Sequence, residues 1–221
     1  MAEDDEIVLN FNDSLLRKSD VNLLGGPCWI NDNLIAFCFE YFEREQFNHS
    51  ADRLALLSPS IAQFIKLAAA EDLTVALEPL NLPTKEYVFV PINDNASTNK
   101  AGGSHWSLMV FVRSKEEFRY YDSGSSNENK AVARNLMDRL QPYLQASKRG
   151  SKFIVMDCPH QNNGYDCGMY VICVAEHLCR EFCECYNVQL MDVITETSVQ
   201  QKRQQLLKLI FDLADQEQPV S

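Results

Sequence analysis

Four polar side chains in this sequence carry groups that could together run nucleophilic chemistry. Cys167 offers a thiol, His105 an imidazole, Asp122 a carboxylate and Gln161 an amide. Each stands where a predicted turn meets a regular element, which is where rigid scaffolds place reactive groups. A thiolate nucleophile, a base, an orienting acid and an oxyanion donor are the parts that acyl transfer through a cysteine requires.

Cys167 is the candidate nucleophile. Residues 163–168 are turn-forming and lead into an apolar helical run, so the sulfur is predicted at a helix N-terminus. There the unpaired N–H groups and the helix dipole favour thiolate. Gly168 is expected to leave space beside the sulfur for a substrate backbone. The alternative is a buried structural thiol, which we expect for Cys173 and Cys179.

His105 and Asp122 flank a predicted hairpin. His105 begins the β-rich run 105–113, and Asp122 ends the run 117–122. If the two strands pair in antiparallel fashion around a turn near Lys115, both residues lie at one open end of the sheet. A carboxylate bound to one imidazole nitrogen then fixes the tautomer and stabilises the imidazolium. Taken alone, the pair is equally compatible with an ordinary histidine at a strand edge.

Three further features surround these residues. Gln161 lies in the loop before Cys167, where its amide could donate to an oxyanion, although a loop glutamine is usually only solvated. Trp29 and Trp106 either pack in the core or form a narrow slot that admits only residues without side chains. The polar loop 93–104 is either an ordinary surface loop or a mobile gate beside the site.

The elements that must position these residues indicate an α+β fold, with helices flanking a central set of strands. Helices are predicted over residues 29–45, 60–70, 126–145, 167–185 and 196–214, and strands over residues 7–11, 87–92, 105–113, 117–122 and 152–157. No repeat or long linker interrupts the pattern. We therefore expect one domain over 1–221, ordered from about 7 to 215, with a flexible acidic N-terminus and C-terminal tail.

The amino-acid composition limits the classes of binding partner that we expect. Thirty-one acids against 20 bases give a net charge of -11, which disfavours nucleic acid and favours a folded partner with a basic patch. The chain shows neither a secretory signal nor a stretch long and apolar enough to span a membrane, so we expect no membrane association. Its eight cysteines are then reduced thiols, and the spacing of Cys179, Cys183 and Cys185 does not fit a metal site.

Three segments taken in order resemble a known family: His105-Trp106, Tyr121-Asp122-Ser123 and residues 161–168. They are similar to the sentrin-specific, ubiquitin-like-protein proteases, which are papain-like cysteine peptidases. Five more segments resemble the branch that acts on the neddylation modifier, namely residues 29–33, 39–42, 63–66, 77–83 and 92–95. The resemblance runs from about residue 7 to about 210. One departure is Gly164, which stands where the family pattern has a small hydroxyl residue.

The resemblance implies a papain-like fold with a central mixed β-sheet flanked by helices. It implies these catalytic roles: Cys167 as nucleophile, His105 as general base and acid, Asp122 as its orienter and Gln161 as part of the oxyanion hole. It implies these substrate-binding roles: Trp29 and Trp106 flanking the channel for the modifier's C-terminal Gly-Gly, and Asp32 meeting a basic residue of that tail. The loop 93–104 is expected to close over the bound tail.

The predicted function is therefore a cysteine peptidase and isopeptidase without cofactor or metal. It would cleave after the Gly-Gly of a ubiquitin-like modifier, the neddylation modifier first, in precursors and in protein conjugates. We expect a monomer in the cytosol, with the nucleus as a second compartment. The alternatives are a protease for the small ubiquitin-related modifier, a non-catalytic binder of such modifiers, and an acyltransferase, which would need a phosphate-binding cluster that is not evident near Cys167.

Overall fold

The computed structural model describes residues 6–97, 102–145 and 150–217 of the 221-residue chain. A five-stranded mixed sheet lies at its centre, with strand order β3-β4-β5-β6-β7. The three inner strands pair antiparallel, and the two outer strands are parallel to their neighbours. The strands are β3 (Leu54–Leu56), β4 (Tyr87–Asn93), β5 (Trp106–Val112), β6 (Glu117–Tyr121) and β7 (Lys152–Val155). A separate hairpin joins β1 (Ile7–Phe11) to β2 (Ser14–Arg17).

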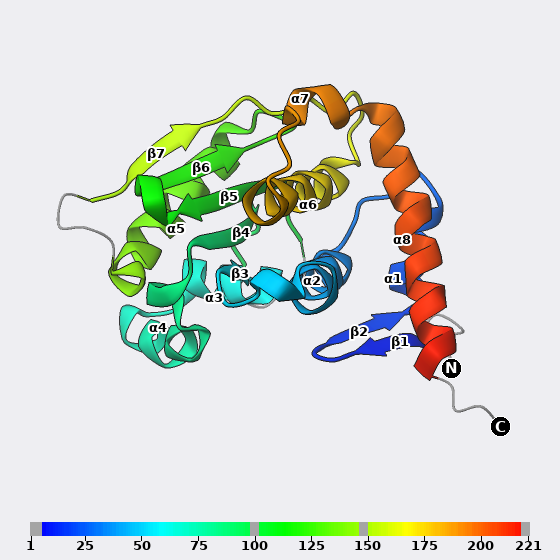
Figure 1. The fold of residues 1–221 in the computed structure, drawn as a ribbon, viewed down its shortest axis with the longest axis horizontal. Coiled ribbons are helices and arrows are strands. Elements are labelled where there is room, and N and C mark those ends of the chain that lie inside the picture. The colour runs from blue at the N-terminus through cyan, green and yellow to red at the C-terminus, as the bar shows by residue number, and fades with distance from the viewer. Residues whose placement is uncertain (1–5, 98–101, 146–149, 218–221) are drawn as a thin grey trace.

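Helices cover the sheet, as Figure 1 shows. They are α1 (Lys18–Asn22), α2 (Asp32–Tyr41), α3 (Pro59–Leu67), α4 (Ala70–Leu77), α5 (Asn127–Leu144), α6 (Cys167–Glu184), α7 (Leu190–Val193) and α8 (Glu196–Glu217). A π-helical turn, Phe42–Gln46, extends α2. Short 3-10 turns span Leu23–Gly25, Asn48–Ser50, Glu78–Leu80, Leu82–Thr84 and Arg113–Lys115. Within the described residues, none of these helices is long and apolar enough to cross a membrane.

Successive side chains of a strand point to opposite faces of the sheet, and helices pack on both faces, so each face contributes to a core. In β5, Leu108 and Val110 pack into one core with α2, α6 and α8. Met109 and Phe111 pack into a second core with α3, α4 and α5. Strands β4 and β5 are therefore largely apolar instead of alternating between apolar and polar residues.

Local sequence signals explain where the helices begin. The side chains of Asn31, Ser58 and Ser126 accept hydrogen bonds from the backbone N–H three residues on, at Leu34, Ile61 and Asn129. Such caps satisfy N–H groups that otherwise have no partner in the first turn. These helix starts follow from short-range chemistry alone.

The predicted α+β fold, with a central mixed sheet flanked by helices, is confirmed, and each predicted helix and strand is present. The expected helix over 60–70 is shorter, because the backbone turns extended at Ala68 and α4 starts anew at Ala70. The short elements β2, α1, β3, α4 and α7 were not expected. The predicted flexible ends at 1–5 and 218–221 lie outside the described residues, and residues 216–217 belong to α8 instead of to a tail.

Candidate active site

The hairpin of β5 and β6 brings two of the candidate residues to one end of the sheet. Leu108 pairs with Tyr121 in an antiparallel register, so the start of β5 faces the end of β6. His105 directly precedes β5 and Asp122 directly follows β6. The predicted hairpin geometry is confirmed.

Asp122 holds His105 through a short hydrogen bond, 2.6 Å from Asp122 Oδ1 to His105 Nε2. The same carboxylate accepts from the backbone N–H of Gly124 at 2.8 Å, from the N–H of Ser126 at 2.7 Å and from the hydroxyl of Tyr120 at 2.8 Å. Burial opposes the charged form, but the hydrogen bonds outweigh it and lower the pKa of Asp122. The residue is therefore a fixed anion behind the imidazole.

His105 connects this anion to the sulfur. Burial by itself lowers the pKa of His105, but its hydrogen bonds to Asp122 and to Cys167 prevail and raise that pKa to about 9. Because Nε2 is bound to Asp122, Nδ1 is the ring nitrogen left for the sulfur. The imidazole is therefore protonated at neutral pH, and an imidazolium beside a cysteine is the pairing that keeps a nucleophilic sulfur charged.

Cys167 is the first residue of α6, as predicted, and its side chain is 3% exposed. It lies on a cleft of about 1000 Å³ that His105, Trp29 and Trp106 also line. The dipole of the 18-residue helix α6 points its positive end at this position. A substrate carbonyl entering the cleft would reach the sulfur and the start of the helix together.

Cys179 of α6 is buried, as the sequence predicts, whereas Cys173 is only partly buried. Burial raises the pKa of Cys173 to about 12 and that of Cys179 well above the ordinary value. Both are therefore neutral thiols packed among apolar side chains. Cys167 is the thiol of this helix that lines the cleft.

Gln161 is hydrogen-bonded to Ser123, the residue after Asp122. Its backbone N–H donates to the carbonyl of Ser123, and its Oε1 accepts from the Ser123 hydroxyl at 2.8 Å. Its Nε2 donates to the carbonyl of Asn163 at 2.7 Å, which leaves one amide hydrogen for a further acceptor. The amide is thus held in one orientation on the loop that leads to Cys167.

We expect the Gln161→Ala variant to lose about a hundredfold or more in turnover, the usual effect of removing one oxyanion donor. Steady-state hydrolysis of a modifier fusion measures it, and a thermal melt shows whether the variant is folded. Asn162→Ala is the matched control, because it removes an exposed amide one residue away. Wild-type turnover in a folded Gln161→Ala variant would refute the oxyanion role.

Both tryptophans line the cleft, and Trp106 also packs against the core. Trp29 is 51% exposed, and its Nε1 donates to the carbonyl of Gly164 at 2.6 Å. Trp106 is half-buried, and its Nε1 donates to the carbonyl of Ile30 at 3.2 Å. Asp32, exposed at the start of α2, lines the same cleft. All three residues line one cleft, and their substrate-binding roles stay a prediction.

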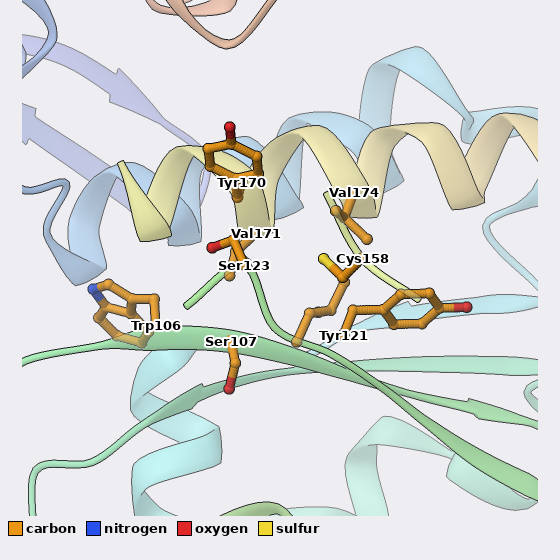
Figure 2. A pocket seen from close by; sticks show the side chains of 9 residues that line it. Trp106, Ser107, Tyr121, Ser123, Cys158, Tyr170, Val171 and Val174 are labelled. Atoms are coloured by element: carbon orange, nitrogen blue, oxygen red, sulfur yellow. The ribbon is translucent and has the colours of Figure 1, made fainter. Parts of the chain in front are cut away.

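Trp106 is supported from behind. Between β5 and α6, a cavity of only about 10 Å³ remains next to its ring, lined also by Ser123, Cys158, Tyr170 and Val171 (Figure 2). Close packing on this side leaves the indole little freedom to move away from the cleft. The wall beside the sulfur is therefore rigid.

The predicted gate, 93–104, includes residues 98–101, which lie outside the described residues. Its two ends are held in place. Asp94 Oδ1 accepts from the backbone N–H of Ser104 at 2.6 Å, and Gln63 Nε2 donates to the carbonyl of Asn95 at 3.0 Å. The gating role stays a prediction.

The expectation for Gly168 is wrong. A Cβ at this position would lie 2.9 Å from Ile30 Cβ and 3.4 Å from Trp106 Cδ1, so the cleft wall, and not a substrate, occupies the space. The glycine lets the start of α6 approach that wall closely. The sequence does not reveal this contact because its partners lie more than 60 residues away along the chain.

Gly124 is a site residue that sequence reasoning missed. A Cβ there would lie 2.5 Å from His105 Cε1 and 3.0 Å from His105 Nε2. We expect Gly124→Ala to push the imidazole off Asp122 and to lower turnover about a hundredfold, as misplacement by about 1 Å can. Gly25→Ala is the control, because nothing lies within 4 Å of a Cβ there. Unchanged turnover in Gly124→Ala would show that the ring has room to shift without loss.

Comparison with known proteins shows which family the chain belongs to. Residues 28–217 match the model of the Ulp1 protease family, C-terminal catalytic domain. The chain is 43% identical over 213 residues to Sentrin-specific protease 8 of Homo sapiens, covering 95% of this chain and 99% of that protein. It is 34% identical over 183 residues to NEDD8-specific protease 1 of Arabidopsis thaliana, covering 82% and 79%. The solved C-terminal Ulp1 protease domain in complex with Smt3, the yeast ortholog of SUMO, shares the fold with a TM-score of 0.72 at 20% identity, covering 96% and 90%.

Proposed function

The chain belongs to the Ulp1 protease family and is a cysteine protease, and from this premise we propose that it acts on the neddylation modifier. It would cleave after the modifier's C-terminal Gly-Gly, both in precursors and in conjugates to other proteins. The proposal is carried by the hydrogen bond between Asp122 and His105 and by Cys167, which lines one cleft together with His105, Trp29 and Trp106. The choice of modifier is supported by NEDD8-specific protease 1 of Arabidopsis thaliana, whose name states that specificity.

The proposed reaction has two halves. The Cys167 thiolate attacks the carbonyl carbon of the modifier's last glycine, and the backbone N–H of Cys167 and the Gln161 amide hold the oxyanion. The His105 imidazolium gives its proton to the leaving amine as the C–N bond breaks, which leaves a thioester. His105 then takes a proton from water, the hydroxide attacks the thioester, and the thiolate leaves with the modifier's carboxylate released.

The cleft supports selection of a glycine tail. Trp29 and Trp106 line the cleft together with Cys167. Next to the sulfur, Ile30 packs against Gly168 and leaves no room for a Cβ there. A bulky side chain near the scissile bond would have to displace rigid aromatic walls. Asp32 on the same cleft adds a negative charge for a basic residue of the tail, and specificity beyond the tail would come from the modifier's folded surface.

Activity-based probes test the proposal. Each probe is one modifier carrying a C-terminal electrophile: the neddylation modifier, the small ubiquitin-related modifier or ubiquitin. We expect the first to form an adduct at Cys167 fastest, with labelling rates compared at equal concentration. Faster labelling by the second would make the chain a protease for that modifier. Binding of the probes without an adduct at Cys167 would refute the role of this residue as the nucleophile.

We further propose that the chain acts as one catalytic domain and as a monomer, since every group named in the reaction comes from one chain. A reducing compartment, the cytosol first and the nucleus second, fits its eight unpaired thiols. Light scattering of the purified protein and imaging of a tagged chain in cells test these two points.

A further inference from the structure

A buried arginine on α8 meets the segment that carries the nucleophile. The side chain of Arg203 is 2% exposed, and that of its partner Asp166 is 1% exposed. Arg203 Nε and Nη2 donate to Asp166 Oδ1 at 3.0 and 2.6 Å. The same guanidinium donates to the carbonyl of Leu23 at 2.9 Å and to that of Cys28 at 2.8 Å. Four of its five N–H donors are accounted for by these contacts.

These partners adjoin both walls of the cleft. Asp166 directly precedes Cys167, and Cys28 directly precedes Trp29. The two walls are also joined by the hydrogen bond from Trp29 Nε1 to the carbonyl of Gly164. One guanidinium on the last helix therefore connects the segment before the sulfur to the segment before the aromatic wall. In Figure 1, α8 packs at the edge of the fold beside the start of α6.

The hydrogen bonds of Asp166 continue into the loop from Gln161 to Asp166. Asp166 Oδ2 accepts from Asn163 Nδ2 at 2.8 Å and from Gln200 Nε2 at 3.0 Å. Asn163 Oδ1 accepts the backbone N–H of Asp166 at 3.0 Å, and the Asn163 carbonyl accepts from Gln161 Nε2. A fixed Asp166 carboxylate thus orients Asn163, and Asn163 orients the amide of Gln161.

Arg203 also decides what the Asp166 carboxylate does to α6. Asp166 is the N-cap residue of the helix, and an aspartate there commonly accepts N–H groups of the first turn. Here its side chain makes no such bond, because Arg203, Asn163 and Gln200 hold both oxygens. A free carboxylate next to Cys167 would repel a thiolate and compete with an oxyanion for the N–H groups.

We propose that Arg203 is a positioning residue for the thiol reaction, which holds and neutralises Asp166 so that the start of α6 stays open to the thiolate and the oxyanion. This inference rests on the proposed role of Cys167. Arg203 touches no reacting atom and acts through Asp166 and the loop from Gln161 to Cys167.

Two variants separate the charge of Arg203 from its shape. Arg203→Lys keeps the charge but loses the planar fork that reaches three acceptors. Arg203→Gln loses both and leaves Asp166 as an unpaired buried anion, which can unfold the protein. The double variant with Asp166→Asn and Arg203→Gln removes both charges and places an amide at each position. Because no unpaired buried charge remains, we expect this variant to fold.

Two readouts are needed. The first is the rate at which iodoacetamide alkylates Cys167 at neutral pH, followed by mass spectrometry of the Cys167 peptide with exposed Cys185 as reference. The second readout is kcat and KM, measured separately for hydrolysis of a modifier fusion. For Arg203→Gln we expect alkylation about tenfold slower and kcat lower by tenfold or more, with KM unchanged. The double variant should recover alkylation, and Arg203→Lys should recover alkylation more fully than kcat.

Lys202→Gln is the matched control. Lys202 is the neighbour of Arg203 on α8 and forms a comparable ion pair, 2.6 Å from its Nζ to Glu176 Oε2, with side chains 14% and 13% exposed. Its loss should lower thermal stability without changing kcat or alkylation per folded molecule. Folded Arg203 variants with wild-type kcat and alkylation would overturn the proposal. If wild-type Cys167 reacts no faster than Cys185, the nucleophile assignment fails instead.

Discussion

Replacing Cys167 with alanine should abolish cleavage while leaving modifier binding intact. The side chain is almost fully buried at the start of α6, so the change removes one sulfur and leaves the cleft walls of Trp29 and Trp106 in place. Without a nucleophile no thioester forms, and loss of a nucleophile has removed roughly a million-fold in rate in another covalent hydrolase. The tail can still enter the cleft, so we expect a stable non-covalent complex.

Two measurements check this expectation. Hydrolysis of a modifier fusion should fall to background, and calorimetric titration of the Cys167→Ala variant with the uncleaved fusion should show saturable binding. Cys185→Ala is the control, because it removes an exposed thiol from the end of the same helix. Residual cleavage by the Cys167→Ala variant above background would end the claim that this sulfur is the nucleophile.

Replacing Asp122 with asparagine should cost about a thousandfold in kcat/KM. The loss should be below the ~10^4 seen for the corresponding aspartate of a serine protease, because a thiol needs less activation than a hydroxyl. The amide brings a donor to a position that now accepts from His105, Tyr120, Gly124 and Ser126. Each carboxylate oxygen accepts from two of these donors, so two donors lose their acceptor to the amide nitrogen, and the imidazole loses its fixed anion.

The same change should move the pH profile. The raised pKa of His105, about 9, depends on its hydrogen bonds to Asp122 and Cys167. Without the aspartate the imidazolium loses its proton at a lower pH, so the alkaline limb of kcat/KM should shift downward.

A pH series of initial rates tests both parts of this prediction. Asp138→Asn is the control, since Asp138 is an exposed carboxylate on α5. Thermal melts should accompany the series, because Asp122 also braces the turn to Ser126. An alkaline limb that stays in place, together with a rate within tenfold of wild type, would show that Asp122 does not orient His105.

Much of the site follows from short-range signals in the sequence. The turn before Cys167 and the apolar run after it predict the helix start, which the structure has at that residue. The paired β-rich runs predict the hairpin that brings His105 to Asp122, and the structure joins them at 2.6 Å. Caps, turns and strand alternation act within a few residues, so they can be recognised without knowing the rest of the fold.

The contacts that tune the site could not be predicted in this way. Gly168 looked like room for a substrate, but Ile30, 138 positions earlier, fills that space. Arg203 lies on the predicted helix 196–214, and no neighbouring residue indicates that it is buried against Asp166. The short strand β3 was missed because three residues carry too little pattern.

The sequence by itself therefore determined which groups are available and the local structure that carries each of them. Tertiary structure alone decided which of these elements meet, which glycines are filled by a neighbour, and which charges are buried together. The physical reason is that local hydrogen bonding is set by adjacent residues, whereas packing depends on surfaces that come together only when the whole chain folds.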